Sequence, residues 1–402
     1  MSKPKIRFKG YEEDWEQRKV KEFAIESEVK GHSGKDAKKL TVKLHNKGVY
    51  VADEKIQGSD NTQYYIRRAG QFIYGKQNFF NGAIGIVPKK LDKYESTKDV
   101  PAFDVSSDVN VDWLYYYIAR PEIYKPQEAL CTGTGSKRFH VNNFYNLSLA
   151  IPKMDEQIKI KEYFVHLDNL ITLHQRKCEE TKKLKKYMLQ KMFPQNGKRV
   201  PEIRFVGFTE DWEQRKFGNV TELKSASRVH KEEWTTSGVP FYRSSDVMAA
   251  INGTENEKVY ISEALYEKLS SISGKLEAGD VLVTGGGSVG KPYIVPNNEP
   301  LYTKDADLLW IKNQGKFHPY FLYEFFFTPT FRSYLSSISH VGTIAHYTIT
   351  QLSETPICLP SVGEQQKIGD YFYNIDHLIT LHQRKYEELQ KIKKFMLQNM
   401  FI

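Results

Sequence analysis

The chain has 402 residues, with 58 lysines and arginines against 49 aspartates and glutamates, and its formal net charge of +9 favours a polyanionic partner. Its length fits about two to three domains, and it has neither an apolar N-terminal segment of the signal-peptide type nor a run of about 18 apolar residues that would suit a membrane span. The three cysteines lie far apart in the sequence, which argues against a zinc ribbon or a disulfide framework, so we expect a cytoplasmic protein that makes no contact with a membrane.

The first element, residues 5–19, occurs a second time at 202–216, with 11 identities in 15 positions. Residues 151–193 likewise return at 359–401, with 26 identities in 43 positions. A repeat of about 200 residues is far longer than the roughly 20 to 50 residues of a solenoid or propeller unit, so it predicts two homologous domains related by a pseudo-two-fold. We call the repeated ends of each copy its frame and the sequence between them its middle.

The middles differ although the frames agree. The offset between the copies grows from 197 to 208, so the second copy contains 11 additional residues, most of them opposite residues 24–69 of the first copy. Similar frames around dissimilar middles favour a molecule whose frames meet common partners while its middles recognise different targets.

Both middles predict mixed α/β domains. Short apolar runs bounded by glycine or proline predict strands at 83–87, 280–284 and 293–295. Residues 111–119 and 320–327 predict helices, which we expect to end at Pro121 and Pro329.

Each copy ends in a predicted amphipathic helix of about 38 residues, roughly 57 Å long at about 1.5 Å per residue. Its apolar residues recur at alternating steps of four and three, interrupted once, at Lys185 in the first helix and at Lys393 in the second. This spacing predicts a coiled-coil-like seam, and the short turn-rich linker between the copies predicts antiparallel helices. The seam residues are Phe164, Leu167, Ile171 and His174 in the first helix, and Phe372, Ile375, Ile379 and His382 in the second.

Two polar features of the helices have alternative interpretations. His174 and His382 would suit a shared metal ion, but the sequence offers no third ligand nearby, so packed imidazoles are favoured and no metal is expected. The lysine cluster at 182–186 is typical of a solvated helix face, and contact with a DNA backbone is the alternative.

The segment from Gly285 to Lys291 fits the Gly-x4-Gly-Lys pattern of a phosphate-binding P-loop and follows a predicted strand. Pro292 replaces the Ser or Thr that would bind Mg²⁺ and disfavours a helical conformation at Lys291, so nucleotide hydrolysis is not expected. The first copy has no counterpart. Two interpretations remain, a structural turn and a loop whose backbone amides hold a DNA phosphate.

Polar, glycine-containing loops precede the long helix in both copies, at 133–140 and 342–347. Glycine permits close approach to a DNA groove, while basic and hydroxyl side chains contact bases or phosphates. No motif for methyl transfer, cofactor binding or metal-carboxylate catalysis recurs in the two halves, so we expect a non-catalytic chain. The candidate DNA-binding residues are Arg67, Arg68, Lys76, Lys137, Arg138, His140, Arg228, Arg243, Ser245, Lys291, Thr343 and His346.

Two frame motifs occur in both copies. Arg-Phe-x-Gly openings begin at Arg7 and Arg204 and continue to Asp-Trp-Glu-x-Arg-Lys, and Pro-x-x-x-Glu-Gln-x-Lys-Ile helix starts begin at Pro152 and Pro360. With these motifs the chain resembles the specificity (S) subunit of type I restriction-modification systems. The stretches 239–243, 279–283 and 287–291 are similar to the target recognition domains of that family.

The resemblance implies an α+β fold, with two homologous mixed α/β target recognition domains separated by two long antiparallel coiled-coil-like helices. Each domain would read one half of a bipartite, interrupted DNA site, and the helix pair would fix the unread spacer. The implied segments are recognition domain 1 (1–154), spacer helix 1 (155–193), a linker (194–201), recognition domain 2 (202–361) and spacer helix 2 (362–402).

The resemblance also implies partners, namely double-stranded DNA, two modification (methyltransferase) subunits, and restriction subunits that act as endonuclease and translocase. S-adenosylmethionine, ATP and Mg²⁺ are then expected on those subunits, and no cofactor is expected in this chain. The repeated Trp15 and Trp212 either mark docking sites for two equivalent partners or pack each opening segment onto the helices.

One alternative is a stand-alone duplicated DNA-binding or coiled-coil scaffold protein. A second is a fused restriction-methyltransferase enzyme, which the missing catalytic motifs disfavour.

Overall fold

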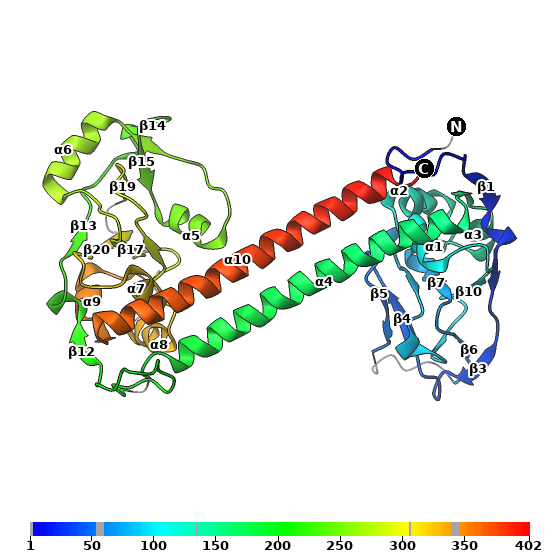
Figure 1. Ribbon diagram of the computed structural model, residues 1–402, viewed down its shortest axis with the longest axis horizontal. Coiled ribbons are helices and arrows are strands. Elements are labelled where there is room, and N and C mark those ends of the chain that lie inside the picture. The colour runs from blue at the N-terminus through cyan, green and yellow to red at the C-terminus, as the bar shows by residue number, and fades with distance from the viewer. Residues whose placement is uncertain (1–2, 54–59, 134–135, 196, 305–306, 339–345) are drawn as a thin grey trace. The chain divides into compact units, whose positions relative to one another are not determined.

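The computed structural model describes residues 3–53, 60–133, 136–195, 197–304, 307–338 and 346–402. The chain folds into two compact units, which we call unit 1 (Met1–His174 with Arg384–Ile402) and unit 2 (Gln175–Gln383). The predicted segments differ from this division, because each unit includes part of both long helices (Figure 1). The α+β class is confirmed in both units.

In each unit, a two-stranded antiparallel sheet joins the two ends of the frame. In unit 1, β1 (Glu16–Lys19) pairs with β11 (Ser148–Ile151), the strand that leads into the first long helix. In unit 2, β12 (Glu213–Lys216) pairs with β21 (Pro356–Leu359) in the equivalent register. The two ends of the frame, more than a hundred residues apart in the sequence, therefore pair directly.

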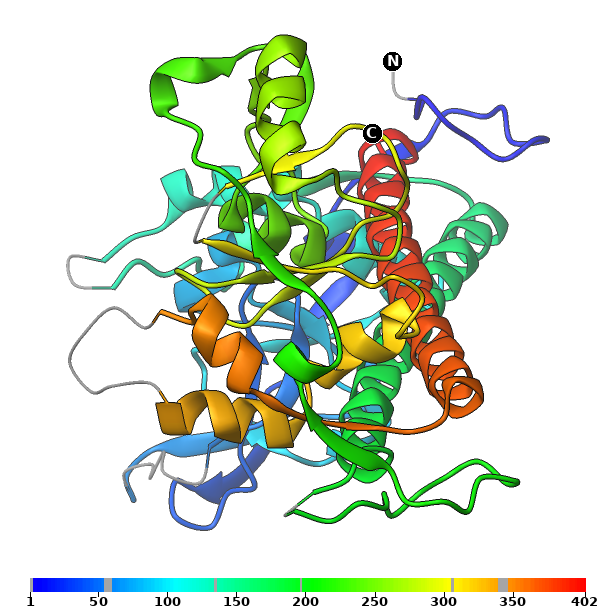
Figure 2. The same ribbon diagram turned by 90° about the vertical axis from the view of Figure 1, so that its left-hand side faces the viewer.

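Both units also contain a four-stranded antiparallel sheet with the same strand order. Its strands are short and largely apolar, and both central strands in unit 2 and one of the two in unit 1 are buried throughout, as expected for short apolar runs. In unit 1 the strands, in order across the sheet, are β2 (Ala24–Glu26), β10 (Ala102–Val105), β7 (Phe72–Tyr74) and β8 (Ile84–Ile86). In unit 2 (Figure 2) they are β13 (Leu223–Ser225), β20 (Leu308–Ile311), β17 (Val281–Thr284) and β18 (Pro292–Ile294). The predicted strands at 83–87, 280–284 and 293–295 are confirmed.

Helices α1 (Val111–Ile118) and α7 (Pro319–Phe325) confirm the two helices predicted in the middles. Both end before the predicted prolines, which instead begin the next helices, α2 (Pro121–Tyr124) and α8 (Pro329–Ile338). Proline is tolerated there because the first position of a helix does not use the N–H that proline lacks. Helices α3 (Val141–Tyr145) and α9 (Ile349–Glu354) lie just before β11 and β21.

The rest of the middles differs between the units. Unit 1 adds a three-stranded sheet and a separate hairpin, whereas unit 2 adds one mixed sheet and two helices. The elements of unit 1 are β3 (Lys30–Ser33), β6 (Gln63–Ile66) and β9 (Glu95–Ser96), with the hairpin β4 (Leu40–Lys43) and β5 (Gly48–Val51). Those of unit 2 are β14 (Trp234–Thr235), β16 (Tyr260–Ile261), β15 (Val239–Tyr242), β19 (Tyr302–Thr303), α5 (Ser244–Asn252) and α6 (Glu263–Ser273). Short 3-10 helices are η1 (Val20–Glu22), η2 (Lys76–Asn81), η3 (Lys89–Leu91), η4 (Lys125–Leu130), η5 (Phe217–Asn219) and η6 (Lys231–Glu233).

The long helices, α4 (Met154–Lys191) and α10 (Val362–Asn399), have 38 residues each. They run antiparallel within each unit, because residues later in α4 contact residues earlier in α10. In unit 2, Cys178 Sγ lies 3.6 Å from Gln383 Oε1, and Lys185 further along α4 pairs with Asp376. Of the predicted seam residues, Phe164, Leu167, Phe372 and Ile375 are buried, and Ile171, His174, Ile379 and His382 are half-buried.

The two interruptions of the apolar seam are equivalent ion pairs. Lys393 Nζ lies 2.5 Å from Asp168 Oδ1 in unit 1, and Lys185 Nζ lies 2.6 Å from Asp376 Oδ2 in unit 2. Each lysine therefore interrupts its own stripe in order to pair with an aspartate of the opposite helix.

The opening segment of each copy packs on the end of the helix from the other copy. Trp15 is buried with its ring 6.4 Å from that of Phe401, and Trp212 is buried with its ring 6.0 Å from that of Phe193. Since both indoles are buried, the packing interpretation of these tryptophans is the one that the structure supports.

Candidate nucleic-acid interface

The glycine-rich segment of unit 2 is the turn of a β-hairpin between β17 and β18. Gly290 N donates to Thr284 O (2.7 Å) and Lys291 N donates to Thr284 Oγ1 (2.9 Å), which closes the turn. Gly287 and Gly290 have φ values of 68° and 70°, in the left-handed region that favours glycine. A strand follows Lys291, whereas a P-loop requires a helix N-terminus at that point. The segment therefore has the geometry of a hairpin turn and differs from that of a P-loop.

A second group of predicted residues lies at the start of α5 in unit 2. The Arg243 Nε atom is 2.9 Å from Asp246 Oδ2, and Arg243 Nη2 donates to Glu257 O at 2.6 Å. Asn256 Nδ2 donates to Asp246 Oδ1 (2.7 Å) and to the exposed Ser245 Oγ (3.1 Å). Arg243 and Ser245 thus belong to one hydrogen-bonded network that ties α5 to the segment after it.

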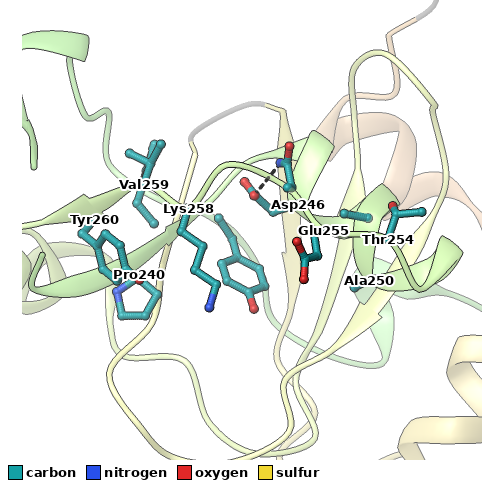
Figure 3. Close-up of a pocket in the computed structure, with 12 residues that line it drawn as sticks. Pro240, Asp246, Ala250, Thr254, Glu255, Lys258, Val259 and Tyr260 are labelled. Atoms are coloured by element: carbon teal, nitrogen blue, oxygen red, sulfur yellow. Dashed lines mark hydrogen bonds between the residues drawn. The ribbon is translucent and has the colours of Figure 1, made fainter. Parts of the chain in front are cut away.

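This network borders an open pocket of about 660 Å³ between α5 and the mixed sheet of unit 2. In Figure 3, Lys258 lies toward Tyr260 and Pro240, whereas Asp246, Glu255 and Thr254 lie on the other side. A pocket with both charges and several aromatic rings offers hydrogen-bonding and stacking contacts, which are the means by which proteins contact bases. The lining residues are Pro240, Phe241, Tyr242, Asp246, Ala249, Ala250, Thr254, Glu255, Asn256, Lys258, Val259 and Tyr260.

In unit 1, the predicted loop residues come together beside η2. Arg138 makes two contacts with the Asp99 carboxylate, at 3.1 and 3.2 Å, and Lys137 Nζ lies 2.8 Å from Glu128 Oε1. Phe139 N donates to Lys76 O (2.8 Å), which joins the loop to η2. Burial lowers the pKa of the half-buried Lys76, against the attraction of Glu26.

His140 completes the unit 1 group, since its exposed imidazole Nε2 is hydrogen-bonded to Thr132 Oγ1 at 3.1 Å. The group formed by Lys76, Lys137, Arg138 and His140 is therefore a basic surface positioned by carboxylates and hydroxyls.

Arg67 is not a surface residue, which corrects its assignment as a DNA contact. Its guanidinium is buried and donates to Ser96 Oγ (2.7 Å), Ser27 O (2.7 Å) and Val100 O (3.1 Å). Burial lowers its pKa to about 10, so desolvation outweighs the nearby carboxylates. The neighbouring Arg68 is exposed, because successive residues near the end of a strand face opposite sides.

The remaining candidates are spread over unit 2. Arg228 and His346 are exposed, and Lys291 is half-buried beside α8. Thr343 lies outside the described residues. The polar partners that position the basic residues, such as Asp99 and Asn256, were missed from the sequence. The Asp246 partner of Arg243 lies three residues away at a helix start, a capping spacing that could have indicated it.

None of the helices described is long and apolar enough to cross a membrane. The residues that the structure describes contain no group of three or more His, Cys, Asp or Glu side chains able to hold a metal ion.

Residues 209–391 match the family model of the type I restriction modification DNA specificity domain. The chain is similar to the type I restriction enzyme MjaVIII specificity subunit of Methanocaldococcus jannaschii, with 24% identity over 366 residues, covering 88% of this chain and 79% of that protein. It is also similar to the MjaIX specificity subunit of the same organism, with 29% identity over 198 residues, covering 48% of this chain and 44% of that protein.

Two solved structures share the fold. One is a type I restriction-modification system S subunit from M. genitalium, with a TM-score of 0.61 and 12% identity, covering 100% of this chain and 99% of that chain. The other comes from a study of complex assembly and conformational transition of the type I R-M system, with a TM-score of 0.51 and 15% identity, covering 97% of this chain and 98% of that chain.

Proposed function

Because this chain belongs to the family of type I restriction-modification specificity subunits, we propose that it selects the DNA sequence on which such a complex acts. The observation that carries this proposal is the combination of two equivalent frames with two different middles. The sheets β1–β11 and β12–β21 repeat in register, while β3–β6–β9 with its hairpin and β14–β16–β15–β19 have no counterparts in each other. Common frames suit identical partners, and different middles suit different DNA targets.

Each unit reads one half of a bipartite DNA site. In unit 1 the basic group around Lys137 and Arg138 supplies groove and phosphate contacts, and in unit 2 the pocket beside Arg243 and Ser245 supplies base contacts. Helices α4 and α10 fix the unread spacer between the half-sites. A helix of roughly 57 Å is long enough for half-sites one DNA turn apart, about 34–36 Å.

Two methyltransferase subunits dock on the repeated parts of the chain. The long helices expose large apolar side chains at equivalent positions, Leu184 and Tyr187 in unit 2 matching Ile392 and Phe395 in unit 1. Exposed apolar residues that occur in equivalent pairs are typical of an interaction surface that is used twice. Restriction subunits join this assembly to translocate and cleave DNA.

The chain itself is non-catalytic in this proposal and takes no cofactor. S-adenosylmethionine is bound by the methyltransferase subunits, and ATP and Mg²⁺ act on the partner subunits. The support is that no catalytic motif recurs in the two halves of the sequence, although a duplicated enzyme would repeat its catalytic residues.

Co-purification with a methyltransferase subunit of a type I restriction-modification system tests this proposal. We expect a stable complex with two methyltransferase subunits per chain, which methylates adenine in DNA, whereas neither component alone modifies a defined sequence. Methyl transfer by the isolated chain would establish the fused-enzyme alternative. Specific DNA binding by a chain that ignores the methyltransferase would establish the stand-alone binding protein.

A further inference from the structure

Three cationic side chains surround the ring of Phe327, which lies between α7 and α8 in unit 2. Lys291 Nζ is 5.3 Å from the ring centroid, Arg332 Cζ is 5.7 Å from it and Lys185 Nζ is 5.7 Å from it. A cation is attracted to an aromatic face, but three positive charges around one ring repel one another unless anions neutralise them.

Only one of these three cations is neutralised within the described part of the chain. Lys185 Nζ pairs with Glu324 Oε1 (2.7 Å) and with Asp376 Oδ2 (2.6 Å). No described carboxylate lies within ion-pair distance of Lys291 or Arg332. Burial, together with repulsion from Arg332, lowers the pKa of Lys291. Two half-buried positive charges therefore stand side by side without a described counter-ion.

Arg332 is held in place by the glycine-rich turn. Its Nη1 donates to Val289 O (3.2 Å) and its Nη2 donates to Gly290 O (2.8 Å), which orients the guanidinium without neutralising it. Gly290 approaches α8 so closely that a Cβ atom there would lie 2.9 Å from Leu335 Cδ2 and 3.2 Å from Arg332 Nη1. The absence of a side chain at Gly290 is thus what allows Arg332 to reach the turn.

The tip of the same turn offers hydrogen-bond donors. Gly287 and Ser288 are exposed, and their backbone N–H groups have no acceptor within the ranges that the structure describes. Backbone amides of a glycine-containing turn beside two cations are a recurrent arrangement for binding a phosphate.

We propose that Lys291, Arg332 and the turn amides of Gly287 and Ser288 form a phosphate site that takes a phosphate of the DNA backbone. This proposal rests on the proposed function of unit 2 as the reader of one half-site. The site holds the duplex without reading its sequence, so it sets register and affinity while the pocket beside α5 supplies base contacts.

The phosphate site belongs to unit 2 alone. At the offset of 208 that aligns the two helices, unit 1 has Ala83, Ala119 and Tyr124 in place of Lys291, Phe327 and Arg332. In unit 1 the turn of the β4–β5 hairpin occupies this position, because Asn46 Nδ2 donates to Ala119 O at 2.8 Å. The two half-sites are therefore held by different backbone contacts.

The test measures binding of a random-sequence duplex to the full-length chain by fluorescence anisotropy over a range of salt concentrations. We expect Lys291→Gln to weaken binding about fivefold and to reduce the slope of log affinity against log salt by about 0.9, the value for one phosphate contact. Lys291→Arg, which keeps the charge, should restore binding, and this rescue separates loss of the contact from loss of folding.

Lys275→Gln is the matched control. Lys275 Nζ also lies over an aromatic ring, 5.5 Å from the centroid of Tyr266, but it pairs with Glu267 at 3.0 Å. The same change of charge there should leave affinity and slope unchanged. Equal binding by wild type and Lys291→Gln would overturn the phosphate site while leaving the proposed function intact.

Two further outcomes would contradict the phosphate site for other reasons. If the wild type bound no DNA, alone or with its methyltransferase subunits, both the proposed function and this site would be wrong. If Lys291→Gln lowered the binding of ATP or inorganic phosphate but left the binding of the duplex unchanged, the site would belong to a free phosphate and the assignment to DNA would be overturned.

Discussion

At the scale of single residues, the two units rely on equivalent buried ion pairs. Arg7 contacts Glu156 through Nε (2.7 Å) and Nη2 (2.8 Å), and Arg204 contacts Glu364 in the same way at the same distances. Each pair joins the opening segment of a copy to the first turn of its long helix. The two glutamate side chains are 2% and 1% exposed, so each carboxylate depends on its arginine in place of water.

Arg204→Ala should destabilise unit 2 by about 3–5 kcal/mol, because it leaves the buried Glu364 carboxylate without its cation. Chemical denaturation, followed by tryptophan fluorescence, measures the loss. Arg215→Ala removes a solvent-exposed arginine from its pair with Glu213 and should cost about 0–1 kcal/mol. Similar losses for the two variants would show that the Arg204 pair is not needed to hold the frame together.

Glu324 gives unit 2 a dependence of stability on pH. Burial raises the pKa of Glu324 to about 8, against the attraction of Lys185, and Asp376, Tyr320 and Tyr323 also face it. The folded chain then retains a proton that the unfolded chain releases, so the free energy of unfolding decreases as pH rises from about 4.5 to about 8. Below this window Glu324 is protonated in both states, and above it ionised in both.

Glu324→Gln should flatten this dependence, since a neutral amide takes the place of the protonated carboxyl. Urea unfolding of unit 2 at pH 5 and at pH 8 measures the effect. The free energy of unfolding of the variant, relative to that of the wild type, should be larger at pH 8 than at pH 5. Glu354→Gln, at an exposed carboxylate that pairs with Lys216, is the control and should leave the dependence unchanged. An unchanged dependence in Glu324→Gln would mean that Glu324 is ionised throughout.

At the scale of elements, the helix pair combines an apolar seam with two polar positions. The 4–3 spacing predicted the buried residues, such as Phe164 and Phe372, because an amphipathic helix buries one side regardless of its partner. The spacing could not identify the partners of Lys185 and Lys393, since each aspartate is about 200 residues away in the sequence and meets its lysine only after antiparallel pairing. Polar positions of this kind are known to specify register between helices.

Lys393→Met should destabilise unit 1 by about 1–2 kcal/mol, because Asp168 keeps only the hydroxyl of Tyr116 as a described partner. We expect the lower end of this range, since the Asp168 side chain is 37% exposed and solvent weakens the pair. Adding Asp168→Leu should recover most of the loss, because it removes the unpaired charge. A double-mutant cycle in thermal or chemical unfolding measures this coupling, and strictly additive losses would contradict it.

The middles show where prediction from the sequence ends. Strands at 83–87 and 280–284 were predicted because short apolar runs are buried in any fold. The contrast between the buried Arg67 and the exposed Arg68 was not predicted. Both residues are arginines, and only the position of the strand decides which of them faces the core. The basic group of unit 1 likewise depends on Asp99 and Glu128, which approach it only in the folded chain.

At the scale of the whole molecule, the two units share a frame and differ in what the frame carries. In unit 1 the turn of the β4–β5 hairpin packs against Ala119, the counterpart of Phe327, and in unit 2 the elements added to the frame line the pocket beside α5. A chain of this kind can change one target without changing its partners. We therefore expect each unit to read its own half-site independently of the other.

Exchanging residues 20–150 for the matching segment of a related specificity subunit tests this expectation. The exchange leaves unit 2 and both long helices intact, and methylated adenines are then mapped across the genome of cells that also express the methyltransferase subunits. We predict that one half of the methylated sequence changes, while the other half and the spacer stay as they are in cells with the original chain. A change in both halves, or in the spacer, would contradict independent reading by the two units.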